Sequence, residues 1–455
     1  MNICLIHSSF DEYSKPTAPI LPIGTIALSD LLNKEGYNSW VLNIDLKLKL
    51  EPEFNLIDYL KAKKCAMVGF TLHWHSQSKK TIELIQNIKT QLPKIKVVVG
   101  GYTASFFAKE ILEFCPEIDF IIKGEAEIPL IKLSNYINSE KENYEKIPNL
   151  VWKKEDRLIS NPLTYVADEK MLNNLCFTNF GLIEDYNNYL KCISVNEMDN
   201  NNEMIFYFVL GRGCNLNCTF CGGSKTSQKI INKRDYITTL KPEKVIKVFK
   251  EIKRYDINRV HIAFDPFLRP NYFKEIFQKI RENKLEFTME FECFKLPTKE
   301  FVDDFKNTFK KDSYLIISPE SGSEKVRKLN RDHHYSNKQL TELLDHLESK
   351  NINVMLCFTA GLPFEEKSDV LKTFKLIRYF KKRYKNVQFA LEPIILDPGS
   401  LLHLYPEKYK VLLYKKSFKD FFFSPSNNSQ GYRNNFFADT KIIEIIKKYR
   451  KTLDL

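Results

Sequence analysis

The feature that most constrains the fold is an alternation of short apolar runs with helical patterns. Runs rich in β-branched residues, without polar alternation, are typical of strands buried on both faces. They occur at residues 3–6, 39–43, 66–70, 96–100 and 119–123. Helical spacing lies between them, and the apolar positions Ile82, Ile85 and Ile88 mark one such helix. Residues 1–135 are therefore predicted to form a doubly wound parallel α/β sheet.

A second strand–helix series begins at Ile205. Strand-like runs lie at residues 205–210, 260–264, 287–291, 314–318, 354–358 and 387–391. Most are followed by a helical pattern, which predicts a partial (β/α)6 barrel over residues 205–400. Residues 136–204, with a hairpin turning at Glu155 and Asp156, are predicted to be a linker, and residues 401–455 a helical C-terminal cap or tail.

Composition and charge limit the classes of protein to which this chain can belong. The 455 residues carry a formal charge of +12, but the lysines are scattered and many adjoin glutamates, which favours solvated helix faces over nucleic-acid binding. There is no apolar run of about 18 residues and no basic segment leading into an apolar one, so we expect no membrane span, no secretory signal and a cytoplasmic location. Ten cysteines are few for a secreted disulfide scaffold, so clustered ones indicate metal or redox ligands.

Three cysteines are clustered directly after the strand that begins at Ile205. Cys214, Cys218 and Cys221 have the spacing C-x3-C-x2-C, and glycines flank them on both sides. Three thiolates on one loop suit a four-iron cluster that leaves one iron open to a small molecule, unlike the four cysteines of a closed cluster or a structural zinc site. Gly222 permits close approach of a ligand.

Three other interpretations of this loop stay open. The cysteines are a chance grouping, or they belong to a closed ferredoxin-like cluster, although no fourth cysteine lies nearby. In the third, they bind zinc together with a distant residue such as His261 or Cys293.

The cysteine spacing, with the aromatic Phe220 before the third cysteine, resembles the signature of the radical S-adenosylmethionine (SAM) superfamily. The resemblance implies that Cys214, Cys218 and Cys221 hold a [4Fe–4S] cluster and that SAM chelates its open iron. Phe220 would then pack near the adenine. One electron from the reduced cluster would cleave SAM to methionine and a 5′-deoxyadenosyl radical, and the protein would position and shield that chemistry.

Further segments resemble the same superfamily. Asp265 stands where its members often carry a Gly-Gly-Glu stretch, and the segment from Ser318 to Arg331 resembles its Ser-Gly-Ser…Asn-Arg pattern. The resemblance implies a SAM site made of Phe220, Gly222, Asp265, Ser318, Glu320, Arg331 and Gly361. Glu320 is alternatively a carboxylate that stabilises a helix start, and Gly361 alternatively serves only the turn into a helix.

The N-terminal half resembles the cobalamin-binding domain fused to many radical SAM enzymes, on the segments at residues 19–28, 97–105 and 118–127. Both resemblances together cover about four fifths of the chain. The implied cobalamin residues follow three strands: Thr71, Leu72, His73, Gly100, Gly101, Tyr102, Gly124 and Glu125. The string Asp-x-His-x-x-Gly, which ligates cobalt from below, is absent. Alternatively the domain is a degenerate scaffold, and His73 and His75 only pack or face solvent.

The resemblance implies cobalamin-dependent C-methylation of a peptide or natural-product precursor, with a reductant such as flavodoxin or ferredoxin as partner. A cobalamin-independent epimerase, dehydrogenase or rearrangement enzyme is the alternative. Cys357 would then be catalytic and return a hydrogen atom from its thiol, unless it is simply a core residue. A non-enzymatic cluster-bearing sensor is a third interpretation.

Overall fold

The computed structural model describes residues 1–8, 20–155, 157–189, 204–264, 269, 271–423 and 429–454. The chain divides into two compact units. The first comprises residues 1–204, 228–234 and 417–425, and the second comprises residues 205–227, 235–416 and 426–455. Among the described helices, none is long and apolar enough to cross a bilayer.

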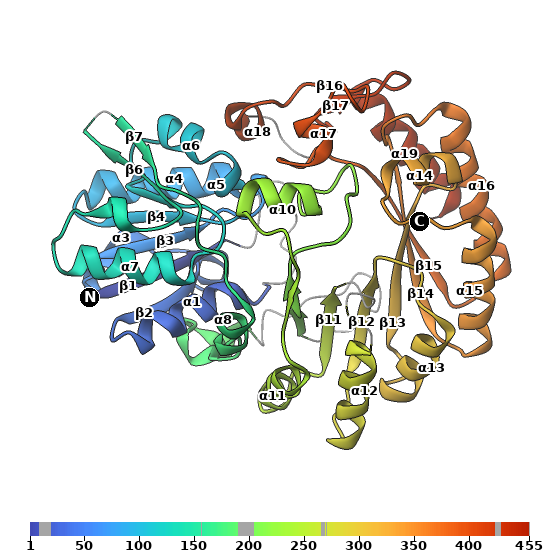
Figure 1. Ribbon diagram of the computed structural model, residues 1–455, viewed down its shortest axis with the longest axis horizontal. Helices are drawn as coiled ribbons and strands as arrows, with labels where there is room; N and C mark the ends of the chain where they lie inside the picture. The colour runs from blue at the N-terminus through green and yellow to red at the C-terminus, as the bar shows by residue number, and fades with distance from the viewer. Residues whose placement is uncertain are drawn as a thin grey trace. The chain divides into compact units, whose positions relative to one another are not determined.

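The first unit is built on a seven-stranded sheet of order β2-β1-β3-β4-β5-β6-β7, with helices on both faces (Figure 1). The strands are β1 (Asn2–His7), β2 (Asn38–Asn43), β3 (Met67–Thr71), β4 (Lys96–Gly100), β5 (Phe120–Ile122), β6 (Leu150–Lys154) and β7 (Arg157–Ser160). The first five pair in parallel, as the apolar runs predicted. β6 and β7 form the predicted hairpin, which extends the same sheet by antiparallel pairing with β5.

One face of this sheet buries a core between the strands and two helices. Ile3, Met67 and Val98 pack there with Leu32 of α1 (Ile23–Lys34) and Leu133 of α7 (Glu127–Asn138). Burying side chains of this size stabilises the fold by about 1.5–3 kcal/mol each. The alternate residues of the strands, such as Cys4 and Val97, are also fully buried, so the sheet is covered on both faces.

The first unit also includes α18 (Phe418–Phe423), from the predicted C-terminal tail. Its Phe418 packs against Phe114 of α6 (Ala108–Phe114), with ring centroids 5.5 Å apart, and Phe418 N–H donates to Glu110 Oε2 at 2.7 Å. Phe421 contacts the His75 ring edge-on at 5.0 Å. His75 therefore has a packing role.

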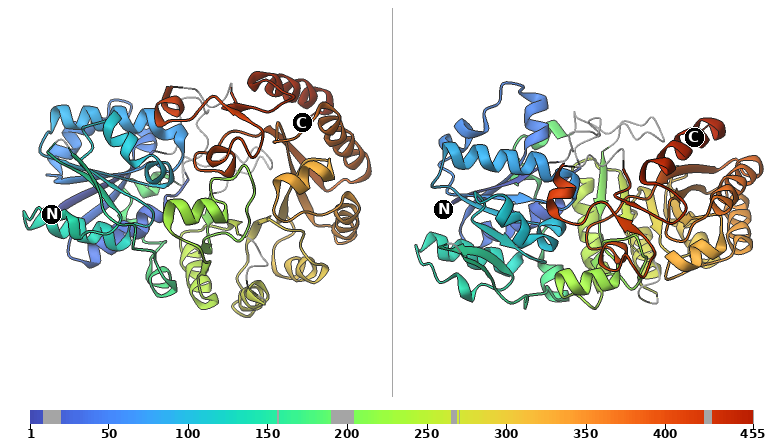
Figure 2. Two further views of the ribbon diagram at one scale, coloured as in Figure 1. Left: turned by 45° about the horizontal axis from the view of Figure 1, so that its top comes forward. Right: turned by 90° about the horizontal axis from the view of Figure 1, so that it is seen from above.

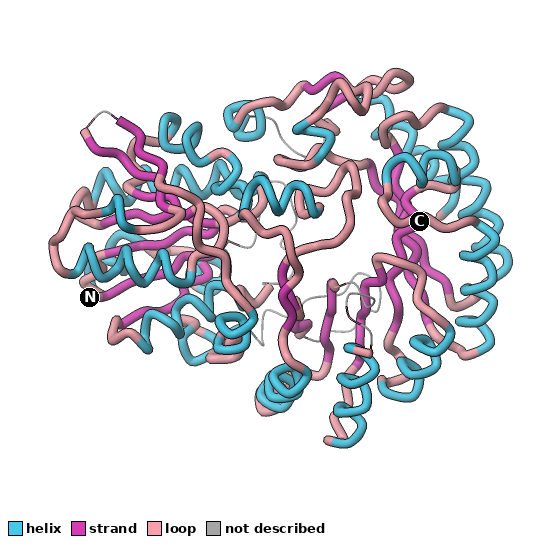
Figure 3. The backbone as a smooth tube through the Cα atoms, in the orientation of Figure 1, coloured by secondary structure: helices cyan, strands magenta, loops and turns pink. Residues whose placement is uncertain are grey.

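The second unit is a partial barrel of six parallel strands in the order β15-β14-β13-β12-β11-β8, which confirms the predicted architecture. These strands are β8 (Ile205–Phe208), β11 (Arg259–Ala263), β12 (Thr288–Cys293), β13 (Tyr314–Glu320), β14 (Asn353–Ala360) and β15 (Val387–Pro393). Its outer helices are α11 (Pro242–Lys253), α12 (Tyr272–Glu282), α13 (Lys299–Thr308), α15 (Asn337–Ser349) and α16 (Lys367–Arg383). Figures 1 and 3 show these helices outside the arc of strands, and the rotated views of Figure 2 agree.

Burial along β14 identifies the inner face of this barrel. Val354, Leu356 and Phe358 are buried, whereas Met355 and Cys357 are half-buried. Because the outer helices cover one face of each strand, the half-buried set faces the interior. The C-terminal helix α19 (Asp439–Leu453) packs beside β15, where Arg450 Nε donates to the Leu391 carbonyl at 2.7 Å.

Candidate active site

The cysteine loop follows a short strand, β9 (Gly211–Arg212), which pairs with β10 (Thr238–Thr239). Cys218 is buried, while Cys214 and Cys221 are half-buried. All three are free cysteines. Burial raises the pKa of the Cys221 thiol to about 12, and the charge of Asp397 adds to it. Cys214 and Cys218 also raise that pKa, so the three thiols lie close enough to interact.

Side chains and backbone from the end of α14 (Glu324–Asn330) hold the loop. Thr219 N–H donates to the Asn330 carbonyl at 2.9 Å, and its hydroxyl donates to Asn330 Oδ1 at 2.8 Å. Asn217 N–H donates to Asp332 Oδ2 at 3.2 Å. Burial raises the pKa of the Cys218 thiol, while the charge of Arg331 and the backbone of Asp332 lower it. The middle of the loop is thus fixed by a segment more than 100 residues away.

Position 222 requires a glycine because Asp397 and Pro398 approach its Cα closely. A Cβ there would lie 2.7 Å from Asp397 Oδ2 and 2.9 Å from the Pro398 carbonyl oxygen. In its absence, Gly222 N–H donates to Asp397 Oδ2 at 2.8 Å. Burial raises the pKa of Asp397 to about 6. Sequence reasoning missed Asp397, although an aspartate just after the last barrel strand was a usable signal.

The donor set fits an iron–sulfur cluster better than a single ion. In the described ranges, no three His, Cys, Asp or Glu side chains converge as the ligands of one metal ion would. Ligands of a zinc ion lie about 2.3 Å from it and must therefore meet at one point. Three thiolates of a four-iron cluster bind three separate irons and need not do so. The zinc interpretation with His261 or Cys293 therefore loses support.

Glu320 and Arg331 form a buried ion pair at the end of β13. Arg331 Nη1 donates to Glu320 Oε1 at 2.9 Å and also to the Ser318 carbonyl, and Nη2 donates to the Phe294 carbonyl at 2.5 Å. Burial raises the pKa of Glu320 to about 7 although the Arg331 charge lowers it. The helix-start interpretation of Glu320 is wrong, because α14 begins four residues later and Glu320 still belongs to the strand.

Two buried polar atoms at this edge have no hydrogen-bond partner within the described part of the chain. They are Arg331 Nε and Thr359 Oγ1. Leaving such a group unpaired costs about 1–3 kcal/mol. A ligand with acceptor atoms, such as the carboxylate of an amino acid, would satisfy either atom, so this edge suits the SAM site that the resemblance implies.

Gly361 and Glu365 shape the turn after β14. Gly361 has φ +94°, and a Cβ there would lie 2.1 Å from Gln430 Nε2. The carboxylate of Glu365 accepts from Gly361 N–H at 2.6 Å and from Leu362 N–H at 3.2 Å. This geometry by itself accounts for the glycine and for the Gly-Leu-Pro-x-Glu spacing.

Glu365 predicts a pH dependence of stability. Burial raises its pKa to about 8, although the N–H groups of Gly361 and Leu362 lower it. In the unfolded chain a glutamate titrates near pH 4.3, at about its reference value. Between about pH 4.5 and about pH 8 the folded state therefore holds a proton that the unfolded state has lost, and stability falls as pH rises. Glu365→Gln should flatten this slope in urea unfolding curves. Glu444→Gln, at an exposed position of α19, should retain it, and an unchanged slope in Glu365→Gln would refute the raised pKa of Glu365.

The barrel interior holds a charged group that sequence reasoning did not assemble. His261 on β11 lies 3.0 Å from Glu290 Oε2 through Nδ1 and 3.0 Å from Glu292 Oε1 through Nε2. Arg259 Nη1 donates to Glu290 Oε1 at 3.1 Å. Burial lowers the pKa of His261, but the two carboxylates raise it to about 9 overall. The imidazolium therefore donates to both carboxylates at neutral pH.

Cys357 lies on the inner face of β14. Burial raises the pKa of its thiol to about 12, and the charges of Glu320 and Glu292 add to this, while a hydrogen bond with the Ser318 side chain lowers it. The thiol is therefore protonated at neutral pH, which is the form that can give up a hydrogen atom.

Two further residues were predicted to bind SAM. Phe220 is half-buried, and Asp265 lies outside the described residues.

In the first unit, the predicted cobalamin residues lie at the carboxyl ends of β3, β4 and β5. Gly101 has φ +109°, and a Cβ there would lie 2.6 Å from the Leu72 carbonyl carbon and 2.9 Å from the His73 nitrogen. The absence of a side chain at position 101 thus allows the loop after β4 to contact the loop after β3. The Leu72 side chain is fully buried, whereas the His73 ring is exposed, 6.1 Å from the Tyr102 ring.

Glu125 is held by an internal ion pair. Arg234 Nε donates to Glu125 Oε1 at 2.6 Å, Nη2 donates to Oε2 at 2.8 Å, and Ala167 N–H donates to Oε2 at 2.8 Å. Arg234 is 1% exposed. The carboxylate therefore organises the unit, and little of it remains for a ligand.

His7 is a candidate that sequence reasoning missed. It ends β1 at the same edge, and burial lowers its pKa to about 4. Neither ring nitrogen has a hydrogen-bond partner among the residues that the structure describes. A neutral imidazole at the carboxyl end of an apolar strand was the available signal.

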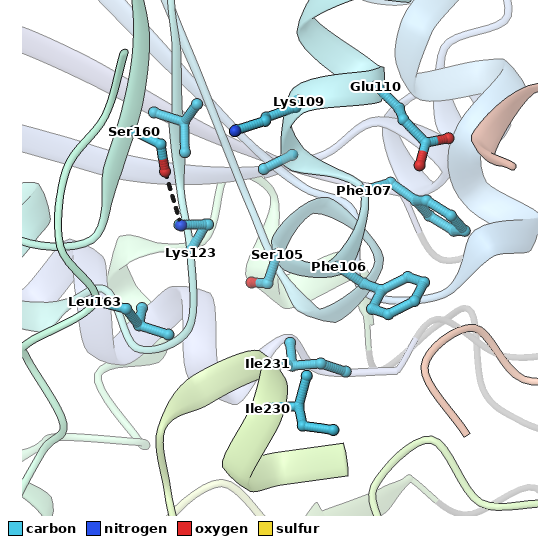
Figure 4. Close-up of a pocket in the computed structure, with 12 residues that line it drawn as sticks. Ser105, Phe106, Phe107, Lys109, Glu110, Lys123, Ser160, Leu163, Ile230 and Ile231 are labelled. Carbon is cyan, nitrogen blue, oxygen red and sulfur yellow. Dashed lines mark hydrogen bonds between the residues drawn. The ribbon is translucent and has the colours of Figure 1, made fainter. Parts of the chain in front are cut away.

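A recess of about 370 Å³ lies elsewhere in the first unit (Figure 4). Phe106, Ile230 and Ile231 give it an apolar wall, and Lys123 donates to Ser160 Oγ at 2.9 Å across it. Burial lowers the pKa of Lys123, and the charge of Lys109, also in the recess, lowers it further. Glu110 also lines the recess, so charged groups of both signs lie beside its apolar wall.

These features define an α/β protein whose partial barrel presents a three-cysteine loop, joined to a parallel sheet with ligand-type loops. The chain matches the family model of the radical SAM superfamily over residues 208–377 and that of the B12 binding domain over residues 15–134. It is a radical SAM enzyme that carries a B12 binding domain.

Two proteins from other organisms are similar to this chain in sequence. The hopanoid C-3 methylase of Methylococcus capsulatus is 25% identical over 152 residues, which are 33% of this chain and 28% of the methylase. The match thus spans less than a third of that enzyme. A protein of Methanocaldococcus jannaschii named for methylthiotransferase activity is 26% identical over 404 residues, which cover 86% of this chain and 79% of that protein.

Two solved structures share the fold. The radical SAM methyltransferase TsrM from Kitasatospora setae, with cobalamin and a [4Fe–4S] cluster bound, has a TM-score of 0.69 at 16% identity, covering 88% of this chain and 76% of TsrM. The cobalamin-dependent radical SAM enzyme OxsB, with aqua-cobalamin and SAM bound, has a TM-score of 0.71 at 16% identity, covering 100% of this chain and 66% of OxsB.

Proposed function

We propose that this enzyme methylates a carbon atom of a peptide or natural-product precursor, using a [4Fe–4S] cluster, SAM and cobalamin. The observation that supports this most strongly is the three-cysteine loop, fixed by Asn330, Asp332 and Asp397 in a chain that also carries a B12 binding domain. When bound, the cluster and SAM supply a 5′-deoxyadenosyl radical that abstracts hydrogen from carbon, and cobalamin supplies the methyl group.

The residues take the following roles in this proposal. Cys214, Cys218 and Cys221 bind three irons. Phe220 packs on the adenine, and Arg331 offers its unpaired Nε–H to the SAM carboxylate. Gly222, Ser318, Glu320 and Gly361 line the same site. The cobalamin site comprises Thr71, His73, Gly100, Gly101, Tyr102 and Gly124, and we add His7 to it. At Leu72 only the backbone would contribute, because the side chain is fully buried.

The proposal predicts two separable results. Anaerobically reconstituted protein with SAM and dithionite should release 5′-deoxyadenosine; no release would refute the radical chemistry. Protein refolded with hydroxocobalamin should keep corrinoid absorbance after gel filtration; loss of all corrinoid would refute the methylase. His73→Ala should lower corrinoid retention about tenfold, and His334→Ala, exposed in the second unit, should not.

A second candidate is a cobalamin-independent epimerase, dehydrogenase or rearrangement enzyme, and Cys357 supports it. Its protonated, half-buried thiol faces the barrel interior near Glu292 and Glu320. In an epimerase, Cys357→Ala should stop turnover and leave 5′-deoxyadenosine release in place. In the methylase, the same change should leave methylation intact.

A further inference from the structure

The second unit contains a recess of about 570 Å³ whose walls include the cysteine loop itself. Asn217 and Thr219, which stand between the cluster cysteines, form one wall. Lys328 and Leu329 of α14 form another, and Tyr405 and Lys408, after α17 (Leu401–Leu404), form a third. Arg331 also lines this recess, so the recess adjoins the SAM-type groups at the end of β13.

A short path joins this recess to the cluster ligands. Asp332 lines the recess, and its carboxylate accepts from Asn217 N–H of the cysteine loop at 3.2 Å. Thr219 lies next to Cys218, and the Leu402 N–H donates to the Thr219 carbonyl at 2.9 Å. A residue that lines the recess is thus the chain neighbour of a proposed cluster ligand. This adjacency suits electron transfer between a partner on this surface and the cluster.

The charges and exposed apolar atoms of the recess point to the class of partner. Lys328, Lys408 and His334 are exposed, whereas Arg331 is neutralised by Glu320, which leaves Asp332 as the opposing carboxylate. Leu329 and Tyr405 are each 44% exposed between the lysines. A small apolar patch flanked by lysines complements an acidic protein surface.

We propose that this recess, the lysine recess, docks an acidic one-electron carrier protein that reduces the cluster. The inference rests on the proposed function, because each reductive cleavage of SAM consumes one electron. In this step the carrier is oxidised by one electron and the cluster is reduced by one, and no bond to the protein forms or breaks. Lys328 and Lys408 orient the carrier through charge, and the wall at Asn217 and Thr219 brings it close to Cys218.

The test compares two reductants on cluster-loaded protein. Stopped-flow absorbance follows cluster reduction by reduced flavodoxin or by dithionite, and calorimetry measures flavodoxin binding. The variant is Lys328→Glu/Lys408→Glu. Its matched control, Lys375→Glu/Lys382→Glu, makes the same charge change on the exposed face of α16. At low salt, we expect the recess variant to bind flavodoxin at least about tenfold more weakly than the wild type does. Flavodoxin should also reduce its cluster at least about tenfold more slowly. Both differences should shrink at high salt.

The outcomes distinguish failure of the docking proposal from failure of the proposed function. Equal reduction of wild type and the recess variant by flavodoxin would overturn the docking proposal, as would an equal loss in the α16 control. Dithionite should reduce wild type and both variants at the same rate, which shows that the cluster is intact. If dithionite reduces no cluster even in the wild type, the proposed function itself fails.

Discussion

Replacing Cys214, Cys218 or Cys221 by alanine is expected to abolish cluster binding and, with it, SAM cleavage. In the proposed assignment each thiolate would bind a different iron, so each variant would lose one of the three protein ligands of the cluster. Anaerobically reconstituted wild type should contain about four irons per chain, and each variant close to none. Release of 5′-deoxyadenosine should fall by about a thousandfold or more, because the electron that cleaves SAM comes only through the cluster.

The control for this experiment is Cys176→Ala. Cys176 is half-buried in the first unit, whereas the cysteine loop belongs to the second unit. It should keep the iron content and the 5′-deoxyadenosine release of the wild type. Retention of full iron by any of the three loop variants would contradict the ligand assignment.

Breaking the Glu320–Arg331 pair is expected to give the largest loss of stability. Both side chains are at least nine-tenths buried, and Arg331 also donates to two carbonyl groups. Arg331→Met removes the charge but keeps the volume, and leaves the Glu320 carboxylate uncompensated. Removing one partner of a buried pair costs about 3–5 kcal/mol. The free energy of unfolding from urea curves measures this loss.

Two further variants distinguish the pair from a general effect of arginine. Glu320→Gln/Arg331→Met leaves no buried charge and should recover about half of the loss. Arg383→Met breaks an ion pair of similar length with Asp345, but those side chains are 44% and 45% exposed, so stability should not change measurably. An equal loss in Arg331→Met and Arg383→Met would show that burial does not set the cost.

The strands and the cysteine loop could be predicted because their signals are local. Apolar runs at 66–70 and 96–100 became neighbouring parallel strands, and C-x3-C-x2-C placed three thiols on one loop. The hairpin was also local, but its addition to the sheet beside β5 was not predictable, since strand pairing depends on tertiary packing.

The rest of the site depends on residues that are far apart in the chain. Asp397 meets Gly222 across 175 positions, and Arg234 meets Glu125 across 109. His261 and Glu290 are adjacent only because β11 and β12 pair in register. No spacing in the sequence encodes such contacts. Glu320 and Arg331 were both singled out by their motif, but their pairing and the place of Glu320 on a strand came from the fold.

A Mössbauer spectrum of protein reconstituted with ⁵⁷Fe, recorded with and without SAM, tests the central claim most directly. We expect one distinct iron in four, whose signal alone shifts when SAM is added, because three cysteines are proposed to bind the cluster and the fourth iron is left to SAM. Four equivalent irons that ignore SAM, or a mononuclear site, would contradict it.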